Sequence, residues 1–269
     1  MRNVTRIIPS RRLVVGVSAP TSQSARARVQ PGARSFIFEL LAGLVALGVG
    51  TEILLYALGG PVALRACAGG LYLALAVVLY GCRGGCPQPF GWANRITLIR
   101  AAAVMLLAGA GMFPAFLAAN VYAFVALAVV CLLLDGVDGW VARRTGCSGA
   151  FGARFDMELD AFFLLVLSVV LVALDKAGLW VLAIGLARYL FVIAQACLPM
   201  LRRPLPPSRL RKIACVWQGA TLMVCLLPAV SATVASSALV IALALLMLSF
   251  GRDIAWLVRQ AGETMRVIG

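Results

Sequence analysis

The sequence predicts an all-α fold, a polytopic membrane helix bundle, and three properties of the chain lead to this fold class. Hydrophobic residues make up 62% of the 269 residues, and the mean hydropathy of +0.99 exceeds that of a soluble globular domain. Several apolar runs reach the roughly 20 residues that a helix needs to cross about 30 Å of hydrocarbon. Acidic residues number only 10. Because lipid cannot satisfy backbone polar groups, each apolar run is expected to be a helix.

Taken in order, the apolar runs give eight expected membrane spans. Residues 1–35 precede them, rich in arginine, serine and proline and free of acidic residues, so a disordered basic arm on the cytoplasmic side is expected there. A tight Gly-Gly-Pro turn at 59–61 separates the first two runs, and Glu39 and Glu52 weaken the first run without excluding it. The expected spans are 36–58, 61–81, 96–113, 119–140, 157–174, 178–199, 213–230 and 235–257.

Arginine sets the expected orientation of these spans. With the N-terminal arm in the cytoplasm, the loops on the same side hold most of the arginines, and the opposite loops hold little beyond Lys176 and Asp175. Basic residues spread over loops between apolar runs do not form the aromatic-interleaved surface of a nucleic-acid site. The expected partner is therefore the anionic surface of the lipid bilayer, and no nucleic acid.

Half of the acidic residues lie in one window between Asp135 and Asp160. Carboxylates inside apolar sequence cost several kcal/mol each unless they are paired or bind a cation. Asp135 and Asp138 are three apart, and Asp156 and Asp160 are four apart, so each pair shares one helical face. Glu158 points roughly 160° away from the second pair and is expected to lie outside the site.

A Gly-rich turn from Gly146 to Gly152 joins the two helices that carry these pairs. The helices would present four carboxylates to each other at the cytoplasmic boundary, where they repel unless divalent cations lie between them. The chain has no histidine, and all-oxygen ligation favours Mg²⁺ or Mn²⁺. Two such ions per site suit phosphoryl chemistry. A non-enzymatic, ion-coupled transporter that uses the acidic cluster is the alternative.

The residues around the carboxylates resemble the signature of a known enzyme family. The pattern D-x2-D-G-x2-A-R-x8-G-x3-D-x3-D, met here at every position, is the signature of the CDP-alcohol phosphotransferases, integral membrane enzymes of phospholipid synthesis. The resemblance implies that Gly139 and Ala142 let a cytidine pack against the helix and that Arg143 holds a diphosphate. An ion-coupled transporter has no need of room for a nucleotide beside its carboxylates, so these residues favour the enzyme over the transporter.

A second stretch resembles the start of the family's first core helix, where the pattern is N-x2-T-x2-R. Its arginine and threonine are expected to contact nucleotide or phosphate, and the alternative is an arginine that snorkels to lipid headgroups beside an internally satisfied threonine. The expected nucleotide-binding set is Gly139, Ala142, Arg143, Gly152, Asn94, Thr97 and Arg100.

The resemblance also divides the chain. Residues 83–269 are expected to form a CDP-alcohol phosphotransferase-like membrane domain with a six-helix core, and residues 36–82 two additional transmembrane helices without an assigned role. Arg211 and Lys212 lie in a segment similar to the family's S-x2-G-K, with arginine where glycine is usual. These two residues either bind an acceptor phosphate or act as orientation signals. Arg188 lies near the middle of its span, where a charge faces a partner or a cavity, so a role in binding the acceptor or a lipid headgroup is expected for it.

The resemblance implies a reaction in which an alcohol hydroxyl attacks the β-phosphorus of a CDP-linked donor, expected to be CDP-diacylglycerol, and CMP leaves. It implies that Asp135, Asp138 and Asp156 are metal ligands and that Asp160 is the general base, which can share a metal. A carboxylate is a weak base for an alcohol, so a neighbouring cation must lower the pKa of the alcohol.

The identity of the acceptor alcohol stays open. Candidates are glycerol 3-phosphate, serine, inositol phosphate, choline or a second lipid, and glycerol 3-phosphate is the default because basic residues are available for its phosphate. The family is typically homodimeric, which leaves a homodimer open for this chain. The expected localisation is the bacterial inner membrane, with the active site facing the cytoplasm.

Overall fold

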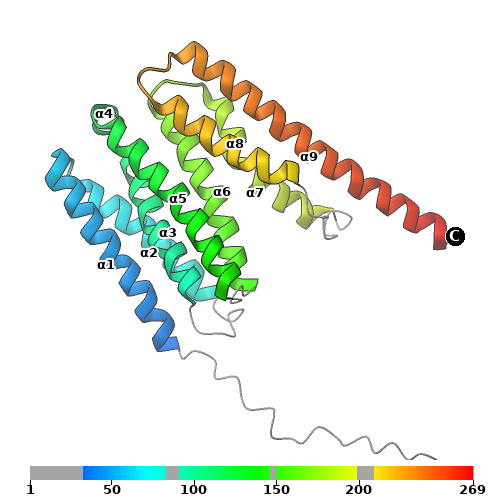
Figure 1. Cartoon of the computed structure of the whole chain (residues 1–269), viewed down its shortest axis with the longest axis horizontal. Coiled ribbons are helices and arrows are strands. Elements are labelled where there is room, and N and C mark those ends of the chain that lie inside the picture. The colour runs from blue at the N-terminus through cyan, green and yellow to red at the C-terminus, as the bar shows by residue number, and fades with distance from the viewer. Residues whose placement is uncertain (1–32, 83–90, 146–149, 199–208, 269) are drawn as a thin grey trace, which may run out of the picture.

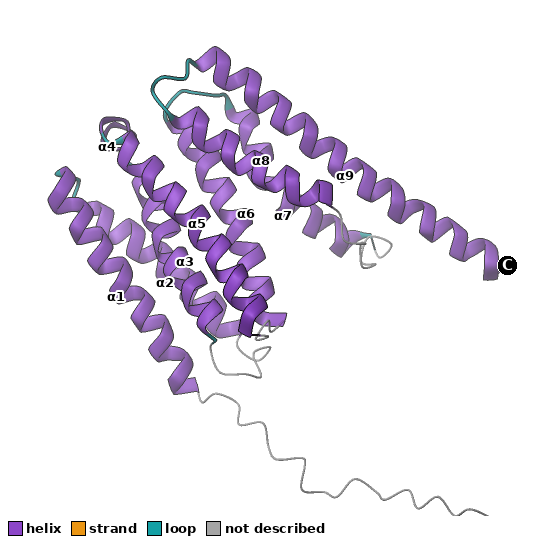
Figure 2. Cartoon of the chain, in the orientation of Figure 1, coloured by secondary structure: helices purple, strands orange, loops and turns teal. Residues whose placement is uncertain are grey.

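A computed structural model describes residues 33–82, 91–145, 150–198 and 209–268, and in these ranges the chain is helical with no strand (Figure 2). The predicted all-α bundle is thereby confirmed. The predicted basic arm falls mostly on residues 1–32, which lie outside the described residues. The helices are α1 (Ala33–Leu58), α2 (Ala63–Cys82), α3 (Trp92–Ala110), α4 (Pro114–Ala119), α5 (Val121–Thr145), α6 (Ala150–Ala173), the 3₁₀ helix η2 (Leu179–Val181), α7 (Leu182–Cys197), α8 (Arg209–Leu226) and α9 (Ala232–Ile268).

Six helices of the described residues are long and apolar enough to cross a membrane: α1, α2, α3, α5, η2 with α7, and α9. The other two predicted spans are also helices. The first half of α6 carries three acidic residues, and the apolar part of α8 is the shorter Ile213–Leu226. Large apolar side chains face outward, among them Tyr56 at 96% and Val77 at 73% exposed. Such a surface suits lipid and not water, so the chain is an integral membrane protein.

The central helix of the bundle is α3, which packs against α1, α2, α5 and α6 (Figure 1). In its span 61% of the residues are buried, against 22–28% in the other spans. Small residues allow this position: a Cβ on Gly109 would lie 3.0 Å from the backbone nitrogen of Ala68 on α2. Most side chains of α3 are therefore enclosed by other helices, and Trp92 and Ile99 are exposed exceptions.

Two helix ends differ from the sequence prediction. α6 begins at Ala150, seven residues before the expected 157, so Gly152 lies inside the helix and not in the turn as predicted. α9 continues to Ile268, well past the expected 257. Hydropathy detects only the apolar part of a helix, so polar turns that extend it beyond the hydrocarbon are missed.

The two helices before the family-like region are packed onto it. Tyr72 of α2 donates a hydrogen bond to the Leu40 carbonyl of α1 (2.9 Å), which ties the two helices together. Glu39 of α1 forms an ion pair with Arg95 of α3, with Arg95 Nη2 2.6 Å from Glu39 Oε1. The ring of Phe36 on α1 meets that of Phe151 on α6 edge to face, with centroids 6.1 Å apart. α1 thus contacts the first turns of both α3 and α6.

Candidate active site

The candidate site lies at one end of the bundle, where α3 and α6 begin and α5 ends. The Asp135–Asp138 pair faces inward from the last turns of α5, and the Asp156–Asp160 pair from the first turns of α6. In Figure 1 these helix ends lie together at one end of the bundle. The structure therefore brings together the four aspartates that helical spacing had paired.

Arg100 of α3 is the centre of this cluster. Its guanidinium is within ion-pair distance of all four carboxylates: it contacts Asp135 directly, and lies 3.6 Å from Asp138, 2.7 Å from Asp156 and 3.1 Å from Asp160. The residue is 2% exposed. Arg100 thus points into the bundle, which rules out the alternative in which it snorkels to lipid headgroups.

The charges of this cluster do not cancel. Four carboxylates and one guanidinium sum to a formal charge of −3, and like charges about 4 Å apart repel by about 4 kcal/mol at an effective dielectric constant of 20. One arginine offsets only part of this repulsion. The cluster accordingly has capacity for additional positive charge.

Three of the carboxylates also have the geometry of a cation site. One oxygen from each of Asp135, Asp156 and Asp160 lies within 4.8 Å of the others. The side chains of all three are partly open to solvent, at 37%, 38% and 51% exposed. An all-carboxylate set in a partly hydrated pocket is the donor set of Mg²⁺ and Mn²⁺, so these residues fit the predicted hard cations.

Asp138 differs from the other three aspartates. It is buried, accepts a hydrogen bond from Thr97 Oγ1 (3.0 Å), and is not part of the three-carboxylate group found among the described residues. Its role as a metal ligand stays a prediction. Thr97 contacts a carboxylate here, so its predicted contact with a nucleotide also stays a prediction.

Asn94 and Gly152 lie against each other where α3 begins beside α6. A Cβ on Gly152 would overlap the side-chain oxygen of Asn94. Glycine at this position leaves room for the Asn94 side chain, which accounts for the motif's glycine by packing. Whether either residue also touches a nucleotide remains a prediction.

The other predicted nucleotide contacts lie on α5. Gly139 is half-buried one residue after Asp138. Ala142 and Arg143 follow one turn later on the same helix, and their side chains lie outside the described part of the chain. For these two positions the structure shows only the backbone, which continues α5 beyond Asp135 toward its C-terminal end.

Arg188 and Glu158, two further residues of the sequence analysis, lie apart from the four aspartates. Arg188 of α7 pairs with Glu158 of α6 (2.5 Å), and its expected role in binding the acceptor or a headgroup stays a prediction. Glu158 thus faces away from the site, as helical spacing predicted.

Arg211 and Lys212 lie in the first turn of α8, and their side chains are outside the described residues.

Sequence reasoning missed the way in which Arg100 acts on the aspartates. The N-x2-T-x2-R pattern singled out Thr97 and Arg100, but as contacts for a ligand, whereas the structure pairs both with carboxylates. The signal that could have revealed this is electrostatic. A chain with four clustered aspartates needs compensating charge nearby, and Arg100 lies about one helical turn inside the expected apolar span 96–113.

The fold and this site define an integral membrane protein with an acidic, cation-competent centre at one end of its helices. A comparison with known families matches residues 90–250 to the model of the CDP-alcohol phosphatidyltransferases, so the chain belongs to this family. Its members transfer a substituted phosphate group from a CDP-alcohol to an alcohol and generally use divalent metal ions. No curated protein and no solved structure matches the chain. α1 and α2 precede the matched region.

Proposed function

We propose that this protein transfers the phosphatidyl group of CDP-diacylglycerol to a small alcohol and releases CMP. The observation that carries the proposal is the convergence of four aspartates of α5 and α6 around Arg100 of α3. A lipid donor accounts for a site among membrane helices, and a soluble leaving nucleotide accounts for its position at the open end of the bundle. The arginine-rich loops support a cytoplasmic site, in a bacterial inner membrane.

In the proposed reaction, the acceptor oxygen forms a bond to the β-phosphorus while the bond from that phosphorus to the CMP oxygen breaks. Asp160, the most exposed of the four carboxylates, takes the proton of the acceptor hydroxyl. Asp135 and Asp156, with Asp138 behind them, would hold the divalent ions. Bound there, such ions supply charge neutralisation of the diphosphate and acidify the acceptor hydroxyl.

Arg100 contributes by holding carboxylates from two helices in place. It bridges Asp135 of α5 and Asp156 of α6, so the two halves of the site stay at a fixed separation without any ligand. Preorganised charge of this kind lowers the reorganisation needed when the transition state forms. We assign Arg100 a positioning role in the proposed reaction.

The acceptor is identified by product analysis. The protein in nanodiscs is incubated with CDP-diacylglycerol labelled in its acyl chains and with glycerol 3-phosphate, serine, inositol phosphate, choline or a second lipid separately. Thin-layer separation is expected to show one new phospholipid that requires both Mg²⁺ or Mn²⁺ and one acceptor. Absence of any new lipid, together with metal- or proton-linked flux in proteoliposomes, would instead support an ion-coupled transporter.

A further inference from the structure

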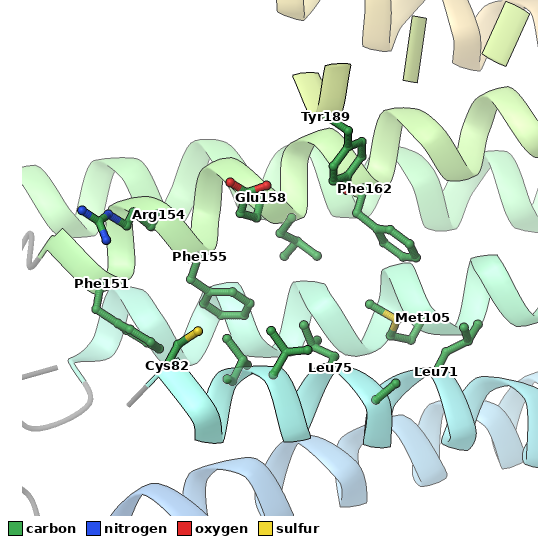
Figure 3. A pocket seen from close by; sticks show the side chains of 14 residues that line it. Leu71, Leu75, Cys82, Met105, Phe151, Arg154, Phe155, Glu158, Phe162 and Tyr189 are labelled. Carbon is green, nitrogen blue, oxygen red and sulfur yellow. The ribbon is translucent and has the colours of Figure 1, made fainter. Parts of the chain in front are cut away.

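A groove of about 790 Å³ runs along the side of α6 that carries neither Asp156 nor Asp160 (Figure 3). On α6 its walls come from residues spaced three and four apart, which form one helical stripe. α2 forms the facing wall, and α3 and α7 add one residue each. The lining is Leu71, Ala74, Leu75, Val78, Leu79, Cys82, Met105, Phe151, Arg154, Phe155, Glu158, Leu159, Phe162 and Tyr189.

The groove is lined mostly by apolar side chains, with Arg154 at one end and Glu158 part-way along it. Arg154 and Phe151 lie at the end near the α6 N-terminus, and Leu71 and Met105 lie toward the other end (Figure 3). The rim on α2 is open, since Val78 is 61% exposed. Such a lining offers water few hydrogen-bond partners. Because the groove lies among membrane helices, we expect lipid hydrocarbon to fill it.

The length of the groove matches one leaflet of a bilayer. The α6 stripe runs from Phe151 to Phe162, and 11 residues at about 1.5 Å each give about 16 Å. The hydrocarbon core is about 30 Å thick, so one leaflet is about 15 Å deep. A chain that enters at Arg154 therefore reaches the middle of the bilayer at the far end.

The charge at the mouth selects the headgroup. Glu158 is already paired with Arg188 at 2.5 Å, so it adds no free negative charge. Arg154 is exposed, and no ion pair involves it in the described parts of the chain. The mouth thus offers one uncompensated guanidinium, a group well suited to phosphate oxygens.

We propose that this groove binds one acyl chain of a non-reacting anionic phospholipid, with the lipid phosphate at Arg154. α6 then separates two sites, the four-aspartate cluster on one face and a bilayer lipid on the other. The role of the added helix α2 is to complete this groove, because Leu71, Leu75 and Leu79 form its second wall. This inference does not depend on which reaction the aspartates perform.

The test is photocrosslinking in nanodiscs, with phosphatidylglycerol that carries a diazirine in the lower half of one acyl chain. Mass spectrometry of the unaltered protein is expected to place crosslinks on the facing stripes of α2 and α6. Even labelling of all lipid-exposed helices would overturn the proposal. So would a groove that is protected from lipid and crosslinked to a second copy of the chain.

Two variants with matched controls test the chain and the headgroup separately. Ala74→Trp fills the groove and is expected to abolish groove crosslinks, whereas Ala66→Trp, exposed on α2 outside the groove, leaves them unchanged. Arg154→Gln is expected to lower labelling by phosphatidylglycerol about fivefold relative to phosphatidylcholine, the effect of one basic residue at an anionic interface. Arg65→Gln, at the other end of α2, is the charge control. Equal effects of variant and control would contradict the proposal.

A final arm separates a bilayer lipid from the donor. Excess CDP-diacylglycerol is added before irradiation in the presence of Mn²⁺. Persistence of the phosphatidylglycerol crosslinks is expected if the groove holds a non-reacting lipid. Loss of the crosslinks in parallel with occupancy of the aspartate site would show that the groove belongs to the donor and would overturn the proposal.

Discussion

Arg100 determines the electrostatics of the site at the scale of single residues. It is buried, and it touches carboxylates from two different helices. Removing one partner of a buried ion pair costs about 3–5 kcal/mol because charge is left uncompensated. In this site, loss of the Arg100 side chain leaves four aspartates without the cation that lies among them. Added metal ions should therefore be able to replace the positive charge that Arg100 supplies.

Arg100→Gln therefore tests this charge balance. Without metal, the variant is expected to lose less stability than the about 3–5 kcal/mol of a fully buried ion pair, because three of the four carboxylates are partly open to solvent. Mg²⁺ or Mn²⁺ should raise its Tm more than that of the unaltered protein, because the formal charge of the cluster changes from −3 to −4. Thermal unfolding in nanodiscs, with EDTA and with each metal, measures both effects. Equal metal-induced shifts in Tm for the two proteins would contradict this account of Arg100.

Asp160→Asn tests the proposed proton acceptor. Loss of a general base lowers the rate by about 10²–10⁴-fold, so kcat should fall while the KM for the donor changes little. Asp175→Asn is the matched control, because Asp175 lies past the far end of α6 and its φ of 53° is one that asparagine tolerates. Near-normal kcat in Asp160→Asn would remove this residue from the mechanism.

At the scale of helices, α6 presents one face to the candidate site and another to the groove. Gly152, Asp156 and Asp160 lie toward α3 and the site, while the stripe from Phe151 to Phe162 faces the groove. The Asn94 side chain of α3 occupies the space that the missing side chain at Gly152 leaves. Small shifts of α6 should therefore disturb the spacing between the carboxylates of α5 and α6.

Gly152→Ala is expected to push α6 away from Asn94 and to destabilise the protein by about 1–3 kcal/mol, the usual cost of overpacking. Gly48→Ala on α1 is the control, because a Cβ there meets no atom within 4 Å and alanine favours the helix. Thermal unfolding of both variants checks the prediction. A Tm for Gly152→Ala as high as that for Gly48→Ala would show that the Asn94 contact is dispensable.

The sequence was sufficient to predict the two carboxylate pairs, because Asp135 and Asp138, like Asp156 and Asp160, are related by local helical spacing. It also predicted the long apolar helices, though not their polar ends, as the early start of α6 shows. The pairing of Arg100 with the aspartates depends on α3 being packed between α5 and α6, and no local pattern encodes that packing. The groove is likewise tertiary, since its two walls come from α2 and α6, which are far apart in the sequence.

At the scale of the whole molecule, the arginine-rich loops predict that the candidate site lies on the cytoplasmic side of the membrane. The helix ends near the site include the start of α1, the end of α2 and the start of α3 (Figure 1). α1 braces this end through Glu39–Arg95 and Phe36–Phe151. The added helices α1 and α2 therefore extend to the end of the bundle that holds the aspartates, and α1 contacts α3 and α6 there.

Reporter fusions test this orientation. Green fluorescent protein fused after residue 269 is expected to fluoresce, because the positive-inside rule places that end in the cytoplasm. Alkaline phosphatase fused after Lys176, in the opposite-side turn that follows α6, is expected to be active. The reverse pattern of activities would place the aspartates on the outer side and contradict a cytoplasmic site.

The most direct test of the proposed transferase is CMP release from CDP-diacylglycerol by the protein in nanodiscs, followed by chromatography with each acceptor. The account predicts CMP and phospholipid in equal amounts, only with Mg²⁺ or Mn²⁺ and an acceptor present, and loss of both products in Asp156→Asn. Undiminished CMP release in that variant or in EDTA, or none with any acceptor, would contradict catalysis by the four-aspartate site.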